Sequence, residues 1–279
     1  MDRKGTSHTA MAAATHRAAH QILEHGRIFS DPLAVAILGV DRDDIERHAR
    51  QTPSSRRMRL FISIRTRFAE DSLAAAYAQG VRQLVVLGAG LDTYAYRKSL
   101  PDGLRIFEVD HPATQAFKRE RLAAAHIETP NALSYVPVDF ERDACGERLS
   151  AAGFDPHVRT FVTWLGVVPY LTEPAIWGTL DYVAALPGGA EVVFDYSNPP
   201  DQLSPERRVE HEARAARVAE LGEEWLSYFD TEALHEQLYR IGFQRLDDLG
   251  PYEIARRYLP DVAAPVSGAG GHIIHAATA

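Results

Sequence analysis

The clearest pattern along the chain is a series of strand-like apolar segments separated by segments with helical spacing. Helical periodicity between the apolar segments predicts helices at 113–125, 173–185 and 231–241. Strands that alternate with helices are typical of a parallel sheet with right-handed crossovers. We therefore expect an α/β fold with a doubly wound, mostly parallel seven-stranded sheet. The seven predicted strands lie at 84–87, 104–109, 133–138, 160–164, 190–195, 243–249 and within the tail 268–279.

The part of the chain before the first strand is mostly helical in character. An Ala-rich helix is predicted at 7–25 and a longer amphipathic helix at 58–78. Between them, Asp31 is predicted to cap a short helix that has Pro32 at its first position and ends at Gly39. The stretch between this short helix and the longer one is interpreted as a charged link.

We expect one domain over residues 1–279. Residues 1–80 would form a helical N-terminal cap or lid, and residues 81–279 the α/β core. A charged helix at 204–226 interrupts the alternation of strands and helices. Its simplest interpretation is a solvated helix, and an insertion that shapes the substrate side is the alternative.

Composition and charge exclude several classes of function. Thirty basic and 38 acidic residues give a formal charge of −8, which is the wrong sign for a nucleic-acid-binding surface. Cys145 is the only cysteine, and we see no His/carboxylate cluster with ligand spacing, so we expect no metal site. The uncharged apolar stretch 160–172 is too short to span a bilayer, and 5–16 lacks the apolar run of a signal peptide. We expect a cytoplasmic protein.

The first predicted strand runs directly into the turn Gly88-Ala89-Gly90. A buried parallel strand that enters a Gly-x-Gly turn is typical of a nucleotide-binding site, because glycine allows a tight turn and close approach of a ligand. The dinucleotide fingerprint requires a third glycine where this chain has Thr93, which disfavours NAD and FAD. A phosphate-binding P-loop is excluded, because no Gly-Lys-Ser/Thr follows the turn.

Carboxylates at the next two strand ends indicate a nucleoside. Asp110 ends the second strand, 20 residues after Gly90, where a carboxylate can accept hydrogen bonds from both ribose hydroxyls. The competing interpretation of Asp110 is a helix cap before Pro112. Asp139 and Phe140 end the third strand and offer an acceptor for an exocyclic amine and a ring face for a purine.

These residues carry a resemblance to the class I S-adenosylmethionine-dependent methyltransferases, which have a Rossmann-like fold. More narrowly, the chain resembles the leucine carboxyl methyltransferase-like family and its bacterial O-methyltransferase branch. The resemblance covers most of the chain and rests on Arg65-Thr66-Arg67-Phe68, Leu87-Gly88-Ala89-Gly90-Leu91-Asp92-Thr93, Phe107-Glu108-Val109-Asp110, Val138-Asp139-Phe140 and Trp164-Leu165-Gly166-Val167-Val168-Pro169-Tyr170-Leu171.

The resemblance implies S-adenosyl-L-methionine as cofactor and S-adenosyl-L-homocysteine as product. The turn Gly88-Ala89-Gly90 would line the amino-acid and ribose portions of the cofactor, and Arg65 would pair with its carboxylate. Asp110 would contact the ribose, and Asp139 and Phe140 would frame the adenine. His111, next to Asp110, and Leu165 are further implied cofactor contacts. Trp164 and Tyr170 would belong to the substrate pocket.

Two positions depart from the family pattern. Many members have an acidic residue where this chain has Leu165, and Arg where it has Tyr94. The first departure leaves contacts with the cofactor ammonium to backbone carbonyls. Both blur the assignment to a subfamily.

The implied activity is O-methyl transfer to a carboxylate or hydroxyl of a small organic metabolite. A carboxylate acceptor needs no base, whereas a hydroxyl does, and His111, Tyr170, Asp195 and Tyr196 are candidates without a spacing that marks any as catalytic. The alternatives are an NAD-dependent oxidoreductase and a catalytically silent protein that binds the same cofactor. The expected partner is a small methyl acceptor, with no nucleic acid and no membrane, and the oligomeric state is open.

Overall fold

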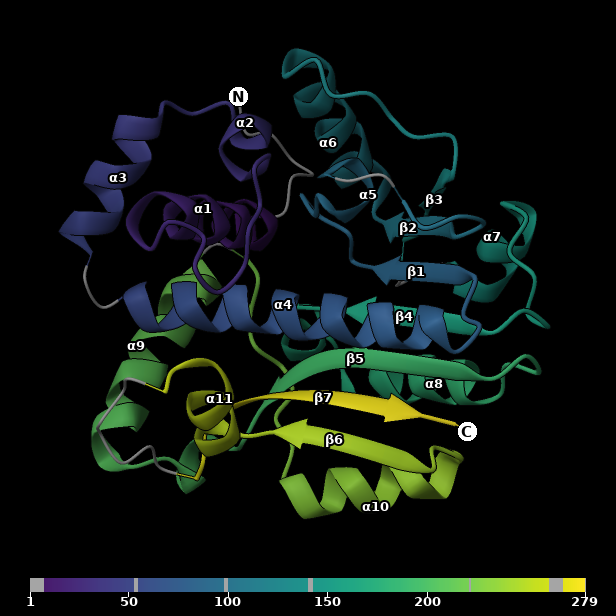
Figure 1. Cartoon of the computed structure of the whole chain (residues 1–279). Coiled ribbons are helices and arrows are strands. Elements are labelled where there is room, and N and C mark those ends of the chain that lie inside the picture. Colours follow the sequence, from purple (N-terminus) through teal and green to yellow (C-terminus); the bar gives the residue numbers. More distant parts are fainter. Residues whose placement is uncertain are drawn as a thin grey trace. The chain divides into compact units, whose positions relative to one another are not determined.

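The fold is described from a computed structural model over residues 8–52, 55–97, 100–139, 143–220, 222–260 and 268–278. In these residues the strands form one seven-stranded sheet in the order β3-β2-β1-β4-β5-β7-β6 (Figure 1). This order confirms the doubly wound, mostly parallel α/β fold expected from the alternating pattern.

The strands lie close to their predicted positions, with most boundaries shifted by only one or two residues. Strands β1, β2 and β3 pair in parallel, as do β4 and β5. Strand β7 is antiparallel to both β5 and β6. The strands are β1 (Gln83–Leu87), β2 (Arg105–Asp110), β3 (Leu133–Pro137), β4 (Thr160–Trp164), β5 (Ala190–Ser197), β6 (Arg245–Leu249) and β7 (Gly271–Ala277).

The helices include all those predicted and several that were not. Helices α3, α7 and α11 were not predicted, and α5 is a short turn of helix directly after the Gly88–Gly90 turn. The helices are α1 (His8–Leu23), α2 (Ala34–Leu38), α3 (Arg42–Gln51), α4 (Arg56–Ala78), α5 (Tyr94–Arg97), α6 (Pro112–Ala124), α7 (Cys145–Ala151), α8 (Glu173–Ala184), α9 (Pro205–Glu220), α10 (Thr231–Ile241) and α11 (Pro251–Tyr258), with 3-10 turns η2 (Val168–Tyr170) and η3 (Pro200–Gln202).

Two predictions in the N-terminal part were wrong. The expected charged link is helix α3, because Asp41 caps it by accepting from the Asp43 N–H at 2.8 Å and because Ile45 and Ala49, one turn apart, are buried. Helix α2 begins at Ala34, so Asp31 is not its N-cap. The predicted end at Gly39 is confirmed, with φ of 58°.

One compact unit of the chain comprises Met1–Asp71 and Val81–Asp155. In the described part of this unit, helices α1, α2 and α3 bury one apolar cluster together with Leu91, which follows the glycine turn, and Leu122 of α6. Shared burial of this kind holds short helices that would not be stable alone. Residue Leu91 therefore connects the N-terminal helices to the turn at the end of β1.

The other compact unit comprises Ser72–Gly80 and Pro156–Ala279. Its antiparallel strands carry a buried polar network, in which the Tyr196 hydroxyl donates to Asp248 Oδ2 at 2.6 Å and lies 3.1 Å from His272 Nδ1. Burial and the Asp248 charge raise the pKa of Tyr196 above its ordinary value. His235 of α10 contacts the same carboxylate at 2.7 Å, so this helix is joined to β6 and β7 by charge-assisted hydrogen bonds.

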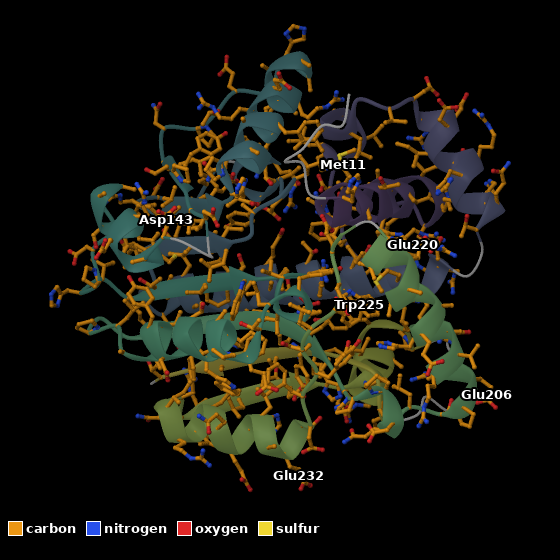
Figure 2. The ribbon with its side chains drawn as sticks, turned by 180° about the vertical axis from the view of Figure 1, so that it is seen from behind. Met11, Asp143, Glu206, Glu220, Trp225 and Glu232 are labelled. Atoms are coloured by element: carbon orange, nitrogen blue, oxygen red, sulfur yellow. The ribbon has the colours of Figure 1, made fainter. Side chains whose placement is uncertain are left out.

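Helix α9 has the solvated character predicted for it, since none of its residues is buried. It ends at Glu220, so the predicted helix over 204–226 extends too far. The segment that follows α9, marked by Trp225 in Figure 2, is held by backbone contacts instead. The Leu226 N–H donates to the Pro169 carbonyl at 2.7 Å, which ties this segment to the loop after β4.

We expect Gly39→Ala to destabilise the protein by about 1–3 kcal/mol. The left-handed φ is unfavourable for alanine, and a Cβ at Gly39 would lie 1.3 Å from Arg121 Nη2, in the guanidinium that donates to the Ile37 and Leu38 carbonyls. Chemical denaturation followed by circular dichroism measures the loss.

The matched control is Gly178→Ala in α8, where an added Cβ meets nothing within 4 Å and the glycine lies inside a helix. This change should raise the free energy of unfolding by about 0.5–1 kcal/mol. Equal effects of the two substitutions on the free energy of unfolding would show that neither the left-handed backbone of Gly39 nor the clash with Arg121 matters.

Candidate functional site

The turn after β1 has the backbone that the glycines were expected to provide. All five residues of β1 are buried, and Gly88 and Gly90 have φ of 63° and 46°. The Ala89 N–H between them donates to the Val109 carbonyl of β2 at 3.1 Å. The turn therefore leaves the sheet while it stays joined to the end of the neighbouring strand.

The carboxylate of Asp110 lies directly against this turn. Its Oδ2 accepts from the Gly90 N–H at 2.5 Å and its Oδ1 accepts from the His111 N–H at 2.7 Å. Burial raises the pKa of Asp110, although the two backbone donors oppose the shift. Each oxygen retains acceptor capacity, so the group fits a pair of ribose hydroxyls beside the glycine turn.

Helix α6 is capped by His111, which settles the competing interpretation of Asp110. The His111 Nδ1 atom accepts from the Ala113 N–H at 3.2 Å, and Pro112 occupies the first helical position. The imidazole is exposed. Asp110 is therefore not needed as a cap, while a cofactor contact by His111 stays a prediction.

The third strand end is described only in part. Asp139 is half-buried, its N–H donates to Asp143 Oδ2 at 2.9 Å, and its carbonyl accepts from the Asp143 N–H at 2.7 Å. The predicted partner Phe140 lies outside the described residues. The role of both residues in binding adenine stays a prediction.

The other predicted site residues lie on separate elements. Arg65 is buried in α4, with 8% of its surface exposed. In the unit that holds β4, Trp164 is completely buried with its ring 6.3 Å from that of Phe194, Leu165 is half-buried, and Tyr170 ends the 3-10 turn η2. The assignment of Arg65 and Leu165 to the cofactor, and of Trp164 and Tyr170 to the substrate, stays a prediction.

A buried ion pair near the end of β2 was not predicted from the sequence. Glu108 lies two residues before Asp110 on β2, and its Oε2 accepts from Lys118 Nζ at 2.7 Å and from the Tyr96 hydroxyl at 3.3 Å. Burial raises the pKa of Glu108 to about 7, against the opposing charge of Lys118. The pair joins α5 and α6 to β2. A charged residue inside a predicted strand was the signal that could have revealed it.

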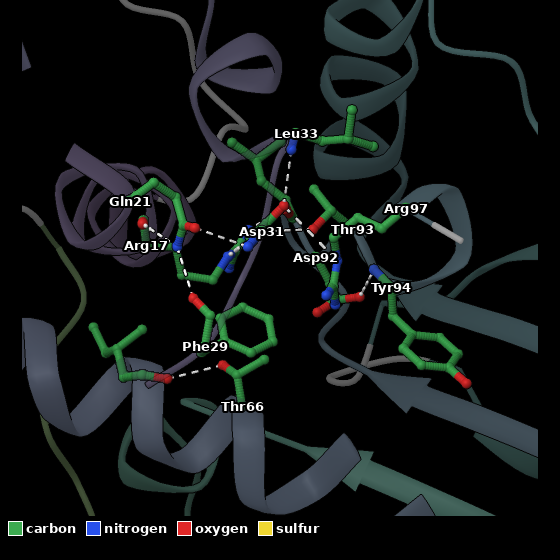
Figure 3. Close-up of polar contacts among 12 residues, drawn as sticks. Arg17, Gln21, Phe29, Asp31, Leu33, Thr66, Asp92, Thr93, Tyr94 and Arg97 are labelled. Carbon is green, nitrogen blue, oxygen red and sulfur yellow. Dashed lines mark hydrogen bonds and ion pairs between the residues drawn. The ribbon is translucent and has the colours of Figure 1, made fainter. Parts of the chain in front are cut away.

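A second missed cluster surrounds Asp31 (Figure 3). The Thr93 hydroxyl donates to Asp31 Oδ2 at 2.7 Å, and Arg17 Nε donates to the same oxygen at 3.3 Å. Asp31 was interpreted only as a helix cap, and Thr93 only as the residue that replaces a third glycine. The cluster places a buried carboxylate from the loop between α1 and α2 beside the segment that follows Gly90.

The described residues contain neither a metal-binding cluster nor a membrane-spanning helix. Among them, no group of three or more His, Cys, Asp or Glu side chains is arranged to hold a metal ion. Every helix in this part of the chain is too short or too polar to span a bilayer.

The sequence matches known proteins over much of its length. A family model described as leucine carboxyl methyltransferase matches residues 10–184. YktD of Bacillus subtilis, provisionally named an S-adenosyl-L-methionine-dependent methyltransferase, is 34% identical over 194 residues, which cover 68% of this chain and 63% of the relative. A relative from Parafrankia with the same provisional name is 34% identical over 213 residues, or 73% and 67% of the two chains. The chain thus spans less than two thirds of the Bacillus relative.

Among solved structures, a DUF574 family protein from Streptomyces avermitilis is similar over 97% of each chain, with a TM-score of 0.58 and 15% identity. At this identity the likeness concerns the fold alone. It agrees with the α/β arrangement of the present chain.

We expect Asp110→Ala to weaken binding of S-adenosyl-L-homocysteine by a factor of roughly ten to a hundred, because two hydrogen bonds to a charged acceptor are lost. Isothermal titration calorimetry measures the affinity. Unchanged binding would show that the ribose lies elsewhere.

The same affinity should depend on pH through Asp110. Burial raises the pKa of this carboxyl, so on acidification it is protonated at a higher pH than an exposed aspartate. The protonated carboxyl can no longer accept hydrogen bonds from both ribose hydroxyls. The affinity should therefore fall as the pH is lowered toward that pKa. The variant Asp110→Asn should bind more weakly but without this pH dependence, and a pH profile like that of the wild type in this variant would contradict the assignment.

Proposed function

Because the chain belongs to the leucine carboxyl methyltransferase family, whose cofactor is S-adenosyl-L-methionine, we propose that it is an O-methyltransferase acting on a carboxylate or hydroxyl of a small organic metabolite. The observation that carries the proposal is the contact between the glycine turn and Asp110, with Gly90 N–H 2.5 Å from Oδ2. The bound cofactor would supply an electrophilic methyl group on a sulfonium. The chain would hold the nucleoside at Gly88–Gly90 and Asp110, and the methionine carboxylate at Arg65.

Among the side chains considered as general bases, His111, Asp195 and Tyr196 make structural contacts. His111 caps α6, Asp195 accepts from the Gly166 N–H at 2.6 Å, and Tyr196 donates to Asp248. Burial also raises the pKa of Tyr196, which makes it a poor base at neutral pH. A carboxylate acceptor is already anionic and needs no base. Between the two acceptor types, this arrangement favours a carboxylate.

The role of Thr93 further disfavours the alternative of an NAD-dependent oxidoreductase. In the NAD fingerprint a third glycine lets helix and strand approach closely. In this chain Thr93 is buried and bonded to Asp31, so the position has another use. A silent cofactor-binding protein has no observation in its favour. We keep the cytoplasm as the proposed location.

Calorimetric titration with S-adenosyl-L-homocysteine and with NAD tests the cofactor. We expect binding of the first and none of the second, because the turn lacks the third glycine and ends against Asp110. Failure to bind S-adenosyl-L-homocysteine would overturn the proposed function.

A methyl-transfer screen tests the acceptor. Tritiated S-adenosyl-L-methionine is offered with a panel of small carboxylic acids, phenols and alcohols, and the labelled product is treated with mild base. We expect label in a base-labile ester, since ester but not ether bonds hydrolyse under these conditions. Transfer to phenols or alcohols alone would contradict the preference for a carboxylate. The variant Asp110→Ala serves as the control with impaired cofactor binding.

A further inference from the structure

The three residues after Gly90 are each fixed by a hydrogen bond. Arg17 Nη2 donates to the Leu91 carbonyl, and the Thr93 hydroxyl donates to Asp31 Oδ2 at 2.7 Å. The side chain of Asp92 accepts from the Tyr94 N–H at 2.8 Å. Two of these three contacts come from the N-terminal helical segment, so the conformation of the loop is set from outside the loop (Figure 3).

The carboxylate of Asp31 is held in one orientation. Its Oδ2 takes the hydrogen bonds of Thr93 and of Arg17 Nε, and its Oδ1 accepts from the Leu33 N–H at 3.1 Å. Arg97 Nε lies 3.8 Å from Oδ1. Only 1% of the residue surface is exposed, so rotation of the carboxylate would leave the buried Arg17 guanidinium without its counter-charge.

Arg17 closes these contacts into a ring. It bonds both Asp31 and the Leu91 carbonyl, and Asp31 bonds Thr93, which lies two residues after Leu91. We call Arg17, Asp31 and Thr93 the loop clamp. Because the ring is closed, the loop cannot shift at one contact without straining the others.

Gly90 itself is confined by α1 and by the end of β2. A Cβ at Gly90 would lie 3.1 Å from Ala10 Cβ of α1, and the Gly90 N–H donates to Asp110 Oδ2. The loop clamp therefore holds the residues immediately after Gly90, while Asp110 holds Gly90. Any movement of Leu91–Thr93 would change the position of the N–H that faces the proposed ribose acceptor.

We infer that Asp31, acting through Thr93, is a positioning residue that fixes the cofactor turn before the cofactor binds. The inference rests on the proposed function, because it concerns the same nucleoside site. Its physical basis is preorganisation: a loop that is already ordered does not lose conformational entropy when the ligand arrives. Neither Asp31 nor Thr93 has to touch the cofactor for this effect.

The test compares two substitutions of Thr93. Thr93→Val keeps the shape but removes the donor to Asp31, and Thr93→Ser keeps the donor. We expect Thr93→Val to bind S-adenosyl-L-homocysteine about tenfold more weakly in calorimetry, and Thr93→Ser to bind within about twofold of the wild type. Binding by Thr93→Val within twofold of the wild type would overturn the inference.

Thr160→Val is the matched control for loss of a buried hydroxyl. Thr160 is completely buried at the start of β4, and its hydroxyl donates to the Val158 carbonyl at 2.9 Å. We expect this variant to lower the melting temperature as Thr93→Val does, but to leave the affinity unchanged. An equal loss of affinity in both variants would mean that general destabilisation causes it, and would refute a positioning role.

Hydrogen–deuterium exchange on the ligand-free protein separates this inference from the proposed function. The amides of residues 88–95 should exchange at least about tenfold faster in Thr93→Val than in the wild type or Thr93→Ser. If the wild type fails to bind S-adenosyl-L-homocysteine, the proposed function falls, and this readout still decides the loop clamp. Exchange equal in all three proteins would overturn it.

Discussion

The parallel pairing of β1 with β2 is the constraint on which the candidate site depends. It places Leu87 opposite Val109, so that the next residues of the two strands, the glycine turn and Asp110, leave the sheet side by side. The hydrogen bond from Ala89 to Val109 extends the pairing into the turn, and that from Gly90 to Asp110 completes it. A shift of the register by one residue would separate the carboxylate from the turn and turn the side chains of β1 to opposite faces. The site is thus a consequence of strand pairing rather than of the glycine pattern alone.

Buried charge accompanies this arrangement on both sides of the turn. Asp31 lies among arginines on the side of the N-terminal helices, and Glu108 pairs with Lys118 on the side of α6. Such pairs add little to stability compared with apolar packing, but each fixes the direction of its partners once it forms. The apolar cluster shared by α1, α2 and α3 provides the stability, and the charged pairs determine how the loop lies on it.

The sequence predicted well what depends on local pattern. Strand runs such as 84–87, the end of α10 at Gly242 and the carboxylate at the end of β2 follow from apolar runs, a left-handed glycine and a fixed spacing. It predicted poorly what depends on distant partners. Asp31 resembles a cap in its local context, yet its Oδ2 accepts hydrogen bonds from the distant residues Arg17 and Thr93. Helix α3 is so rich in charge that only its cap and two buried positions distinguish it from a loop.

The long sequence separations within the loop clamp have a consequence for folding. Asp31 and Thr93 are 62 residues apart, and Arg17 and Leu91 are 74 apart. Contacts between distant residues require closure of a long loop and are slow to form compared with the turns of a helix. During synthesis, Asp31 has no hydroxyl partner until Thr93 has emerged from the ribosome. The loop clamp is therefore among the later parts of this unit to reach its native conformation.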